Sequence, residues 1–337
     1  MTAAATGSAR CAICFASDAG YLVPTLVAAA QARRWSGAAL AEVFVFAIGL
    51  DARAADAAAP ACDAAGVRLV RADAFMDDAG VGDAMMARLL LDQLVPPGFA
   101  EFLYLDADVQ VVGSLDPLLA CGVPPGHVRA ALDPMAFRVR SGGRDGAAMA
   151  ARMAAAGVPA ARWPHYFNSG VLHIARDGWG DIGGAALVLH RGAPAGQPFP
   201  DQDALNIAAA DRTITMSLAW NFPIFLRNAG LDRVVRPAIL HFMAQPKPWD
   251  GDFPPWSRAD TQPYADLLQR YPGLVPYLTT MPVVRRLRYA LQQRGKRLLE
   301  ARSWGRGALR GAVLEAEVGL GQRGGLSVLH GAPTCTS

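Results

Sequence analysis

Short runs of apolar residues alternate with alanine-rich stretches along most of the chain. The runs have the length and composition of buried strands, and several of the stretches between them are long enough for helices. Predicted strands cover residues 12–16, 42–48, 67–70, 101–105, 128–132, 166–174, 213–218 and 238–242. Predicted helices cover residues 24–34, 53–65, 82–94, 146–156 and 204–210. This alternation predicts an α/β domain with a mainly parallel central sheet and helices on both faces.

One of the apolar runs stops abruptly at two acids. Residues 102–108 read Phe-Leu-Tyr-Leu-Asp-Ala-Asp, so Asp106 and Asp108 lie where the chain leaves the core. In open α/β sheets this edge is where ligands bind. Two carboxylates there suit a divalent cation such as Mg²⁺ or Mn²⁺ that also holds substrate phosphates. The structural alternative is that either acid only caps the next turn.

Other polar side chains end or interrupt apolar runs further along the chain. They are Asp18, Asp133, Asn168, Asp201, Gln202, Asp203, His241 and Lys247. Each has a structural alternative, since Asp18 and Asp201 are in positions suited to helix caps and a histidine on an apolar strand is usually part of the core. Residues 199–203 predict a loop before a helix. Together these side chains predict acids, an imidazole and an ammonium at one edge of the sheet.

Composition narrows the class of protein. The 337 residues are 52% hydrophobic and carry a net charge of only +3, which does not indicate a dedicated nucleic-acid binder. We find no leader-like opening segment and no apolar run of membrane-spanning length, so the expectation is a soluble cytoplasmic protein. Cys11 and Cys14 form a C-x-x-C inside an apolar run, and without a second pair at zinc-site spacing they predict buried thiols.

The character of the chain changes near Pro276. Basic residues dominate residues 285–310, where Glu300 is the only acid, and leucines recur among them at helical spacing. Such a basic amphipathic helix suits an anionic membrane surface, and equally a solvated helix that closes the domain. We therefore predict three parts: a main α/β domain over residues 1–274, a basic helical extension over 275–318, and a flexible tail over 319–337.

Several of these segments, taken in order, resemble the bacterial family 8 glycosyltransferases, a retaining group that includes lipopolysaccharide galactosyl- and glucosyltransferases. The resemblance covers about residues 11–250. The matching segments are Phe15-Ala-Ser-Asp18, Arg88-Leu, Leu103-Tyr-Leu-Asp-Ala-Asp108, Tyr166-Phe-Asn-Ser-Gly-Val-Leu172, Asp201-Gln-Asp-Ala-Leu-Asn206 and His241-Phe-Met-Ala-Gln-Pro-Lys-Pro-Trp249. The resemblance implies a single GT-A-like, Rossmann-type domain and a role in lipopolysaccharide biosynthesis.

The resemblance also implies roles for the donor-binding residues. Asp106, Asp108 and His241 would hold Mn²⁺, or Mg²⁺, with the imidazole favouring Mn²⁺. The cation would bridge the diphosphate of UDP-galactose or UDP-glucose and stabilise the leaving group. The remaining donor contacts implied are Arg88 facing the donor, Lys247 on the diphosphate, and Ala16 and Asp18 at the uracil and ribose.

The transferred sugar is implied to lie against Asn168, Asp201 and Gln202, with Asp133 near the acceptor, a glycan or lipid-linked saccharide. Gln202 would lie on the far face of the sugar, but an amide is a poor nucleophile. We therefore favour same-face substitution over double displacement, with Asp201 supporting oxocarbenium-like charge. The chain departs from the family pattern at Met85 and at other positions that bear on donor choice.

Two other functions stay open at this point. A sugar-nucleotide nucleotidyltransferase would need a basic, glycine-rich loop to grip a triphosphate, and residues 16–24 contain no Lys or Arg. A non-catalytic glycan- or membrane-binding relative is disfavoured because the whole implied ligand set is present. For the transferase we expect a cytoplasmic protein, with peripheral contact at the inner face of the membrane through the basic segment.

Overall fold

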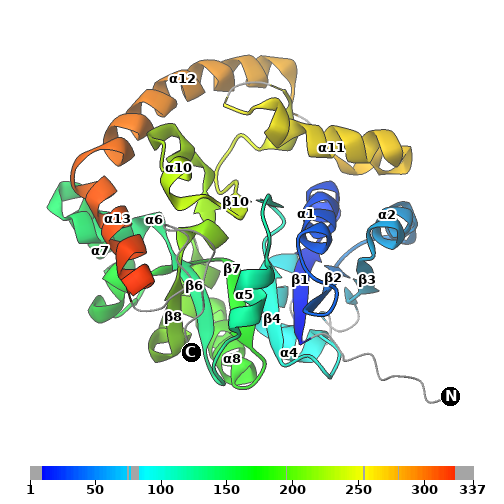
Figure 1. The fold of residues 1–337 in the computed structure, drawn as a ribbon, viewed down its shortest axis with the longest axis horizontal. Coiled ribbons are helices and arrows are strands. Elements are labelled where there is room, and N and C mark those ends of the chain that lie inside the picture. Colours follow the sequence, from blue (N-terminus) through cyan, green and yellow to red (C-terminus); the bar gives the residue numbers. More distant parts are fainter. Residues whose placement is uncertain are drawn as a thin grey trace.

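The computed structural model describes residues 10–73, 76, 83–194, 196–252, 255–279 and 281–322 (Figure 1). Within these residues the central sheet has seven strands. In spatial order they are β3 (Arg68–Arg71), β2 (Ala41–Ala47), β1 (Cys11–Ser17), β4 (Glu101–Leu105), β7 (Phe167–Ala175), β6 (Val128–Leu132) and β8 (Thr213–Met216). A smaller sheet pairs β5 (Val109–Val111), β10 (Ile239–His241) and β9 (Phe222–Pro223).

Six of the seven strands run in one direction and β7 runs against them. The pairs β3–β2, β2–β1, β1–β4 and β6–β8 are parallel, whereas β7 is antiparallel to both β4 and β6. Leu105 at the end of β4 is therefore opposite Val171 in the middle of β7, so the first residues of β7 extend past the end of β4. The reversal brings the beginning of β7 to the edge where β1 and β4 end, which is the edge at which ligands are expected.

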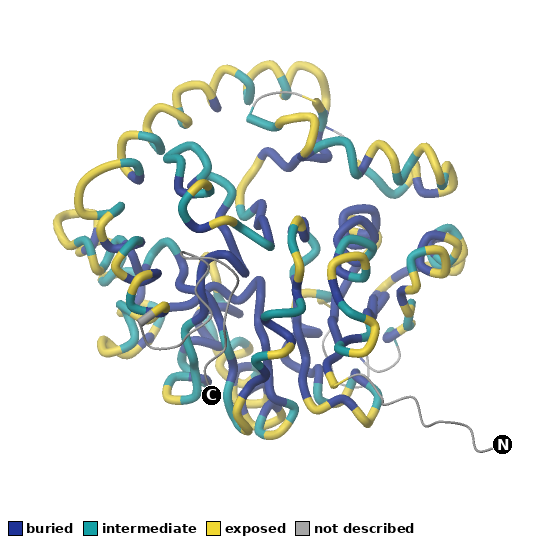
Figure 2. The backbone as a smooth tube through the Cα atoms, viewed as in Figure 1, coloured by how far each residue is buried: buried dark blue, intermediate teal, exposed yellow. Residues whose placement is uncertain are grey.

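Helices cover both faces of the sheet, and each face has its own apolar core. In β1, Ile13 and Phe15 join a core that includes α1, α2, α5 and α6, while Ala12 and Cys14 join a second core with α4, α8 and α9. Alternate residues of a strand point to opposite faces, so the fully buried β1 contributes to both cores. Figure 2 shows the buried strands between their more exposed helices. The predicted fold class is confirmed.

The helices have the following bounds. They are α1 (Leu22–Arg34), α2 (Ala52–Ala65), α4 (Leu91–Leu94), α5 (Asp116–Cys121), α6 (Pro134–Ser141), α7 (Gly143–Ala155), α8 (Trp179–Arg191), α9 (Pro200–Ala208), α10 (Asp232–Val235), α11 (Arg258–Arg270), α12 (Val283–Gly305) and α13 (Gly307–Gln322). Turns of 3-10 helix are η1 (Ala84–Leu90), η2 (Ala160–His165), η3 (Ala210–Arg212), η4 (Leu218–Trp220), η5 (Ile224–Ala229), η6 (Pro248–Asp250) and η7 (Pro272–Tyr277).

The structure corrects two of the predicted elements and adds helices that were not predicted. Residues 83–94 form the 3-10 turn η1 followed by the short α4 instead of one α-helix, and residue 82 lies outside the described residues. The predicted loop 199–203 is wrong, because α9 begins at Pro200, a residue well suited to the first turn of a helix. The helices α6, α8 and α11 were not predicted.

The C-terminal part of the chain is helical, as expected. Trp304 at the end of α12 and Val313 in α13 are buried in the first of the two cores. The predicted tail over 319–337 lies largely outside the described residues, and its first four residues complete α13. Among the described helices, none combines the length and the hydropathy that a membrane crossing requires.

Candidate active site

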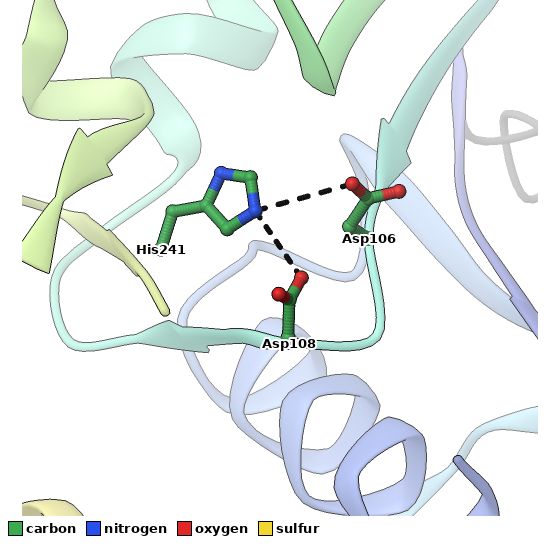
Figure 3. Close-up of side chains that lie close together, drawn as sticks. All are labelled: Asp106, Asp108 and His241. Carbon is green, nitrogen blue, oxygen red and sulfur yellow. Dashed lines mark ion pairs between the residues drawn. The ribbon is translucent and has the colours of Figure 1, made fainter. Parts of the chain in front are cut away.

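The predicted metal ligands meet at the ligand edge of the sheet. Asp106 and Asp108 lie in the turn between β4 and β5, and His241 is the last residue of β10. Antiparallel pairing of β5 with β10 places His241 opposite Val109, directly after the acids. The Phe242 amide then donates to the Asp108 carbonyl oxygen at 2.9 Å. Backbone pairing in the small sheet therefore brings the imidazole to the acids (Figure 3).

The distances between the three side chains suit a shared cation. The His241 Nε2 atom is 3.2 Å from Asp108 Oδ1 and 3.9 Å from Asp106 Oδ2. One potential ligand atom from each residue lies within 4.8 Å of the others. Two ligands of one octahedral cation, each about 2.1 Å from it, are separated by about 3 Å. The two carboxylates and the imidazole therefore fit a divalent first-row ion.

A buried amide holds the imidazole in this orientation. Asn221, only 2% exposed, places its Oδ1 atom 2.8 Å from His241 Nδ1. If Nδ1 carries the proton and donates it to Asn221, the Nε2 lone pair faces the acids. Metal-binding histidines almost always have such a partner on the second nitrogen. Asn221 was not among the predicted site residues.

Two cations neutralise the acids in this structure. The Arg88 Nη2 atom is 3.0 Å from Asp106 Oδ1, and the Lys247 Nζ atom is 2.6 Å from Asp108 Oδ2. Burial raises the pKa of Asp108, but His241 and Lys247 outweigh this effect and hold the pKa below its ordinary value. Burial also raises the pKa of Asp106, and there the neighbouring Arg88 offsets the rise only in part. Both predicted donor-side cations therefore lie beside the acid pair.

Arg88 is fixed by more than its ion pair. Its side chain is 3% exposed, and its Nη1 atom donates to the Ser169 carbonyl oxygen at 3.0 Å. The guanidinium carbon also lies 4.8 Å from the centre of the Tyr104 ring. Burial lowers the pKa of Arg88, but the carboxylates of Asp106 and Asp201 contribute to a net rise, so the guanidinium stays charged.

Two clefts adjoin at the acid pair. The first, about 280 Å³, is lined by Ala16, Asp18 and Tyr21. The second, about 410 Å³, is lined by the predicted sugar-side residues Asp133, Asn168, Asp201 and Gln202, together with His241. Both clefts are also lined by Met85, Arg88, Asp106 and Asp108. The predicted metal ligands Asp106 and Asp108 therefore lie between two chambers, each of a size suited to part of an elongated ligand.

The second cleft has a connected polar floor. Asn168 Nδ2 donates to Asp133 Oδ2 and to Gln202 Oε1, each at 3.1 Å. Gln202 Nε2 donates to the same Asp133 oxygen at 3.2 Å, and the Ser169 amide donates to Gln202 Oε1 at 3.1 Å. Asn168 Oδ1 accepts from Asn221 Nδ2 at 2.9 Å. Asn221 thus connects this floor to His241, and every polar atom of the Gln202 amide group is engaged.

The first cleft has an aromatic wall that the sequence analysis missed. Tyr21 is 39% exposed, and its ring meets Trp249 edge to face with centroids 5.9 Å apart. Asp18 Oδ1 accepts from the Tyr21 amide at 3.0 Å, which leaves Oδ2 without an assigned partner among the described contacts. In the sequence, the sign of this wall was an aromatic residue three positions after Asp18. A flat base placed here would meet both a ring and a carboxylate oxygen.

The predicted donor, sugar and metal residues therefore gather around one pair of clefts, with Lys247 present through its bond to Asp108. Asp203 does not join them, because its carboxylate is paired with Arg152 at 2.6 Å and accepts from Tyr166 at 2.7 Å. Asp133 has a further task, because its Oδ1 atom caps α6 by accepting from the Met135 amide at 2.9 Å. The predicted buried thiols are confirmed at Cys11 and Cys14, which are unpaired. Burial raises the pKa of both.

Comparison with known proteins agrees with this geometry. The sequence profile described as "Glycosyl transferase family 8" matches residues 12–252, which is well over half of the chain. The chain belongs to glycosyl transferase family 8. The family resemblance drawn from the ordered motifs is thereby confirmed, and the nucleotidyltransferase alternative is not supported. The two clefts and the acid–imidazole cluster all lie within the matched residues of this family 8 member.

Similar proteins include a curated lipopolysaccharide glucosyltransferase, WaaO of Escherichia coli (strain K12). It is 28% identical over 160 residues, which are 44% of this chain and 43% of WaaO, so the match spans less than half of that relative. The galactosyltransferase LgtC, solved with donor and acceptor sugar analogues, has a TM-score of 0.58 and 23% identity. That match covers 82% of this chain and 99% of LgtC.

The bifunctional glycosyltransferase WbbM, solved without ligands, has a TM-score of 0.60 at 16% identity. The match covers 82% of this chain and 52% of WbbM. At these identities the solved structures support the fold of the family 8 member, which is the GT-A-like fold that the motifs implied.

Proposed function

We propose that this family 8 member transfers galactose or glucose from the UDP-sugar to a glycan or lipid-linked saccharide, with retention of configuration, in lipopolysaccharide biosynthesis. One observation carries the proposal: a set of divalent-cation ligands lies between two adjoining clefts. A nucleoside fits the aromatic-walled cleft, a sugar fits the polar-floored cleft, and a diphosphate joins them beside the ligands. The similarity to WaaO and LgtC supports the substrate class.

The residues of the first cleft would bind the nucleotide. Tyr21 would stack on the uracil, and the Asp18 Oδ2 atom would accept from its N–H. A cation held by Asp106, Asp108 and His241, for which Mn²⁺ is the better candidate, would supply Lewis-acid stabilisation of the UDP leaving group. Lys247, once released from Asp108, would place its ammonium on the same diphosphate as a mobile point charge.

The polar floor supports same-face substitution. Gln202 has its amide oxygen held by Asn168 and Ser169, so the oxygen is not free to attack the sugar. In the step we favour, the bond from the sugar C1 to the β-phosphate oxygen breaks and a bond from C1 to the acceptor oxygen forms on the same face. The proton of the acceptor hydroxyl passes to the released phosphate oxygen. Asp201 would face the developing positive charge at C1.

The test is a panel of nucleotide sugars with Mn²⁺ present. We expect slow release of UDP from UDP-galactose or UDP-glucose even without acceptor, and loss of this activity on addition of EDTA. Asp108→Asn should lower the rate by about two orders of magnitude or more, because one ionised ligand is lost. The matched control is Asp63→Asn, since Asp63 is exposed on α2 far from the acid pair in sequence and fold.

The proposal fails if no UDP-sugar in the panel is turned over or protects the protein from thermal unfolding. It also fails in its metal-dependent form if folded Asp108→Asn is as active as the Asp63→Asn control. The anomeric configuration of a glycoside product, read by NMR coupling constants, separates retention from inversion.

A further inference from the structure

The helix α12 turns its apolar side chains toward solvent. Val284, Leu287, Leu291 and Leu298 are 81%, 65%, 71% and 73% exposed. Positions separated by three, four and seven residues lie along one face of a helix, so these side chains form one stripe. Figure 2 shows α12 as a largely exposed arch along the rim of the molecule.

The face that α12 turns toward the body of the protein carries polar side chains along its middle and one buried aromatic ring near its end. Gln293 is 7% exposed, and Glu300 accepts from Asn228 Nδ2 at 2.7 Å and pairs with Lys296 at 3.7 Å. The buried Trp304 packs on Phe225 with ring centroids 5.5 Å apart. This is the reverse of an ordinary surface helix, whose apolar stripe faces the core. These contacts also fix the rotation of α12, so the stripe cannot turn inward without breaking them.

Positive charge flanks the exposed stripe. The exposed basic residues of α12 are Arg285, Arg288, Arg294, Arg297 and Arg302. The only acid in α12 is Glu300, and its carboxylate is engaged with Asn228 and Lys296 on the inward face. The outward face is therefore apolar along its middle and cationic along its sides. This combination matches the boundary between anionic headgroups and acyl chains.

We propose that α12 seats the protein on the surface of an anionic phospholipid bilayer, with its leucine stripe at the level of the headgroups. The binding does not depend on the proposed transfer reaction. It does bear on that reaction, because Phe225 lines both the cavity beneath α12 and the sugar-side cleft. If the proposed function holds, the sugar cleft opens beside the membrane, where a lipid-linked acceptor arrives.

The experiment is flotation of the full-length protein with vesicles of phosphatidylethanolamine and phosphatidylglycerol, compared with vesicles of phosphatidylcholine alone. We expect the protein to float with the anionic vesicles only. The combined variant Leu287→Gln, Leu291→Gln and Leu298→Gln should weaken binding at least about ten-fold. A second variant, Arg288→Gln, Arg294→Gln and Arg297→Gln, should weaken binding most at low salt, and its difference from wild type should shrink as salt rises.

Two controls replace exposed residues of the same kinds elsewhere on the surface. Val188→Gln removes a 70% exposed apolar residue from α8, and Arg53→Gln, Arg144→Gln and Arg233→Gln together remove three exposed arginines from other helices. All variants should keep the wild-type melting temperature and the wild-type release of UDP in vesicle-free solution. The proposal is overturned if the wild-type protein does not float with anionic vesicles, or if the leucine variant floats as well as its control. It is also overturned if the leucine variant only converts a dimer to a monomer.

Discussion

Replacing Asn221 by leucine removes the partner of the His241 Nδ1 atom while keeping the branched shape of the side chain. Asn221 is 2% exposed, so water does not readily replace the 2.8 Å hydrogen bond. Leaving a buried donor without a partner costs about 1–3 kcal/mol. Loss of an outer partner of a metal-binding histidine typically lowers metal affinity about 10- to 100-fold, which is about 1.4–2.7 kcal/mol. The cost of the unpaired donor and the typical loss of metal affinity agree in magnitude. We therefore expect Asn221→Leu to weaken Mn²⁺ binding by about 10- to 100-fold.

The assay is calorimetric titration of the donor-free protein with Mn²⁺, alongside the melting temperature. Asn221→Asp keeps an oxygen for the imidazole but loses the amide hydrogens that reach Asn168. We expect both variants to melt earlier than wild type, and only the leucine variant to lose Mn²⁺ affinity. Asn228→Leu, which breaks a bond to Glu300 away from the acids, should lower stability alone. Wild-type Mn²⁺ affinity in the leucine variant, or equal losses in both Asn221 variants, would refute the positioning role.

Two further changes test other parts of the structure. A Cβ at Gly170 would lie 2.3 Å from His241 Cε1 and 2.7 Å from Asp106 Oδ2. Gly170→Ala should therefore weaken Mn²⁺ binding about ten-fold or more in the same titration. The control Gly184→Ala, which adds a methyl group in open space on α8, should leave Mn²⁺ binding unchanged. Burial raises the pKa of Glu317 in α13, so its contribution to stability is fully present below the ordinary pKa of the carboxyl and is lost as pH rises through the raised value. Thermal melts from about pH 5 to about pH 7.5 should therefore show the melting temperature of Glu317→Gln rising relative to that of wild type as pH rises. A difference in melting temperature that does not change with pH would contradict this.

Much of the site could be predicted because its residues interrupt strong apolar patterns. Asp106 and Asp108 follow the four apolar residues that end β4, and His241 ends the otherwise apolar β10, so each stands out from its neighbours. The direction of β7 could not be predicted from its residues, since an apolar run pairs equally well in either direction. That direction decides whether Asn168 or Ala175 lies at the ligand edge, and the ordered family motifs supplied the answer that the pattern lacked.

Local features of the sequence explain why α8 and Asn221 were not predicted. In α8 the glycines at 183 and 184 lower helix propensity, so the segment has no clear helical signal. The structure explains Gly183: a Cβ there would lie 2.0 Å from the Leu89 carbonyl oxygen, so close packing on η1 excludes any side chain. Asn221 was missed because its position depends on β9, a strand of only two residues. An element of two residues is too short to show a periodic pattern from which it could be predicted.

The ligands of the proposed cation come from distant parts of the chain. Asp106 and Asp108 directly follow β4, which belongs to the half of the sheet built before residue 106, and His241 is reached only after β6, β7 and β8 have completed the other half. A bound ion would therefore link the two halves of the sheet, which meet where β4 pairs with β7. At a free concentration 100 times its dissociation constant, a ligand adds about 2.7 kcal/mol to folding stability. At a low cellular concentration of that ion, both the amount of folded enzyme and its turnover would fall. The supply of the metal would then set the abundance of the folded protein.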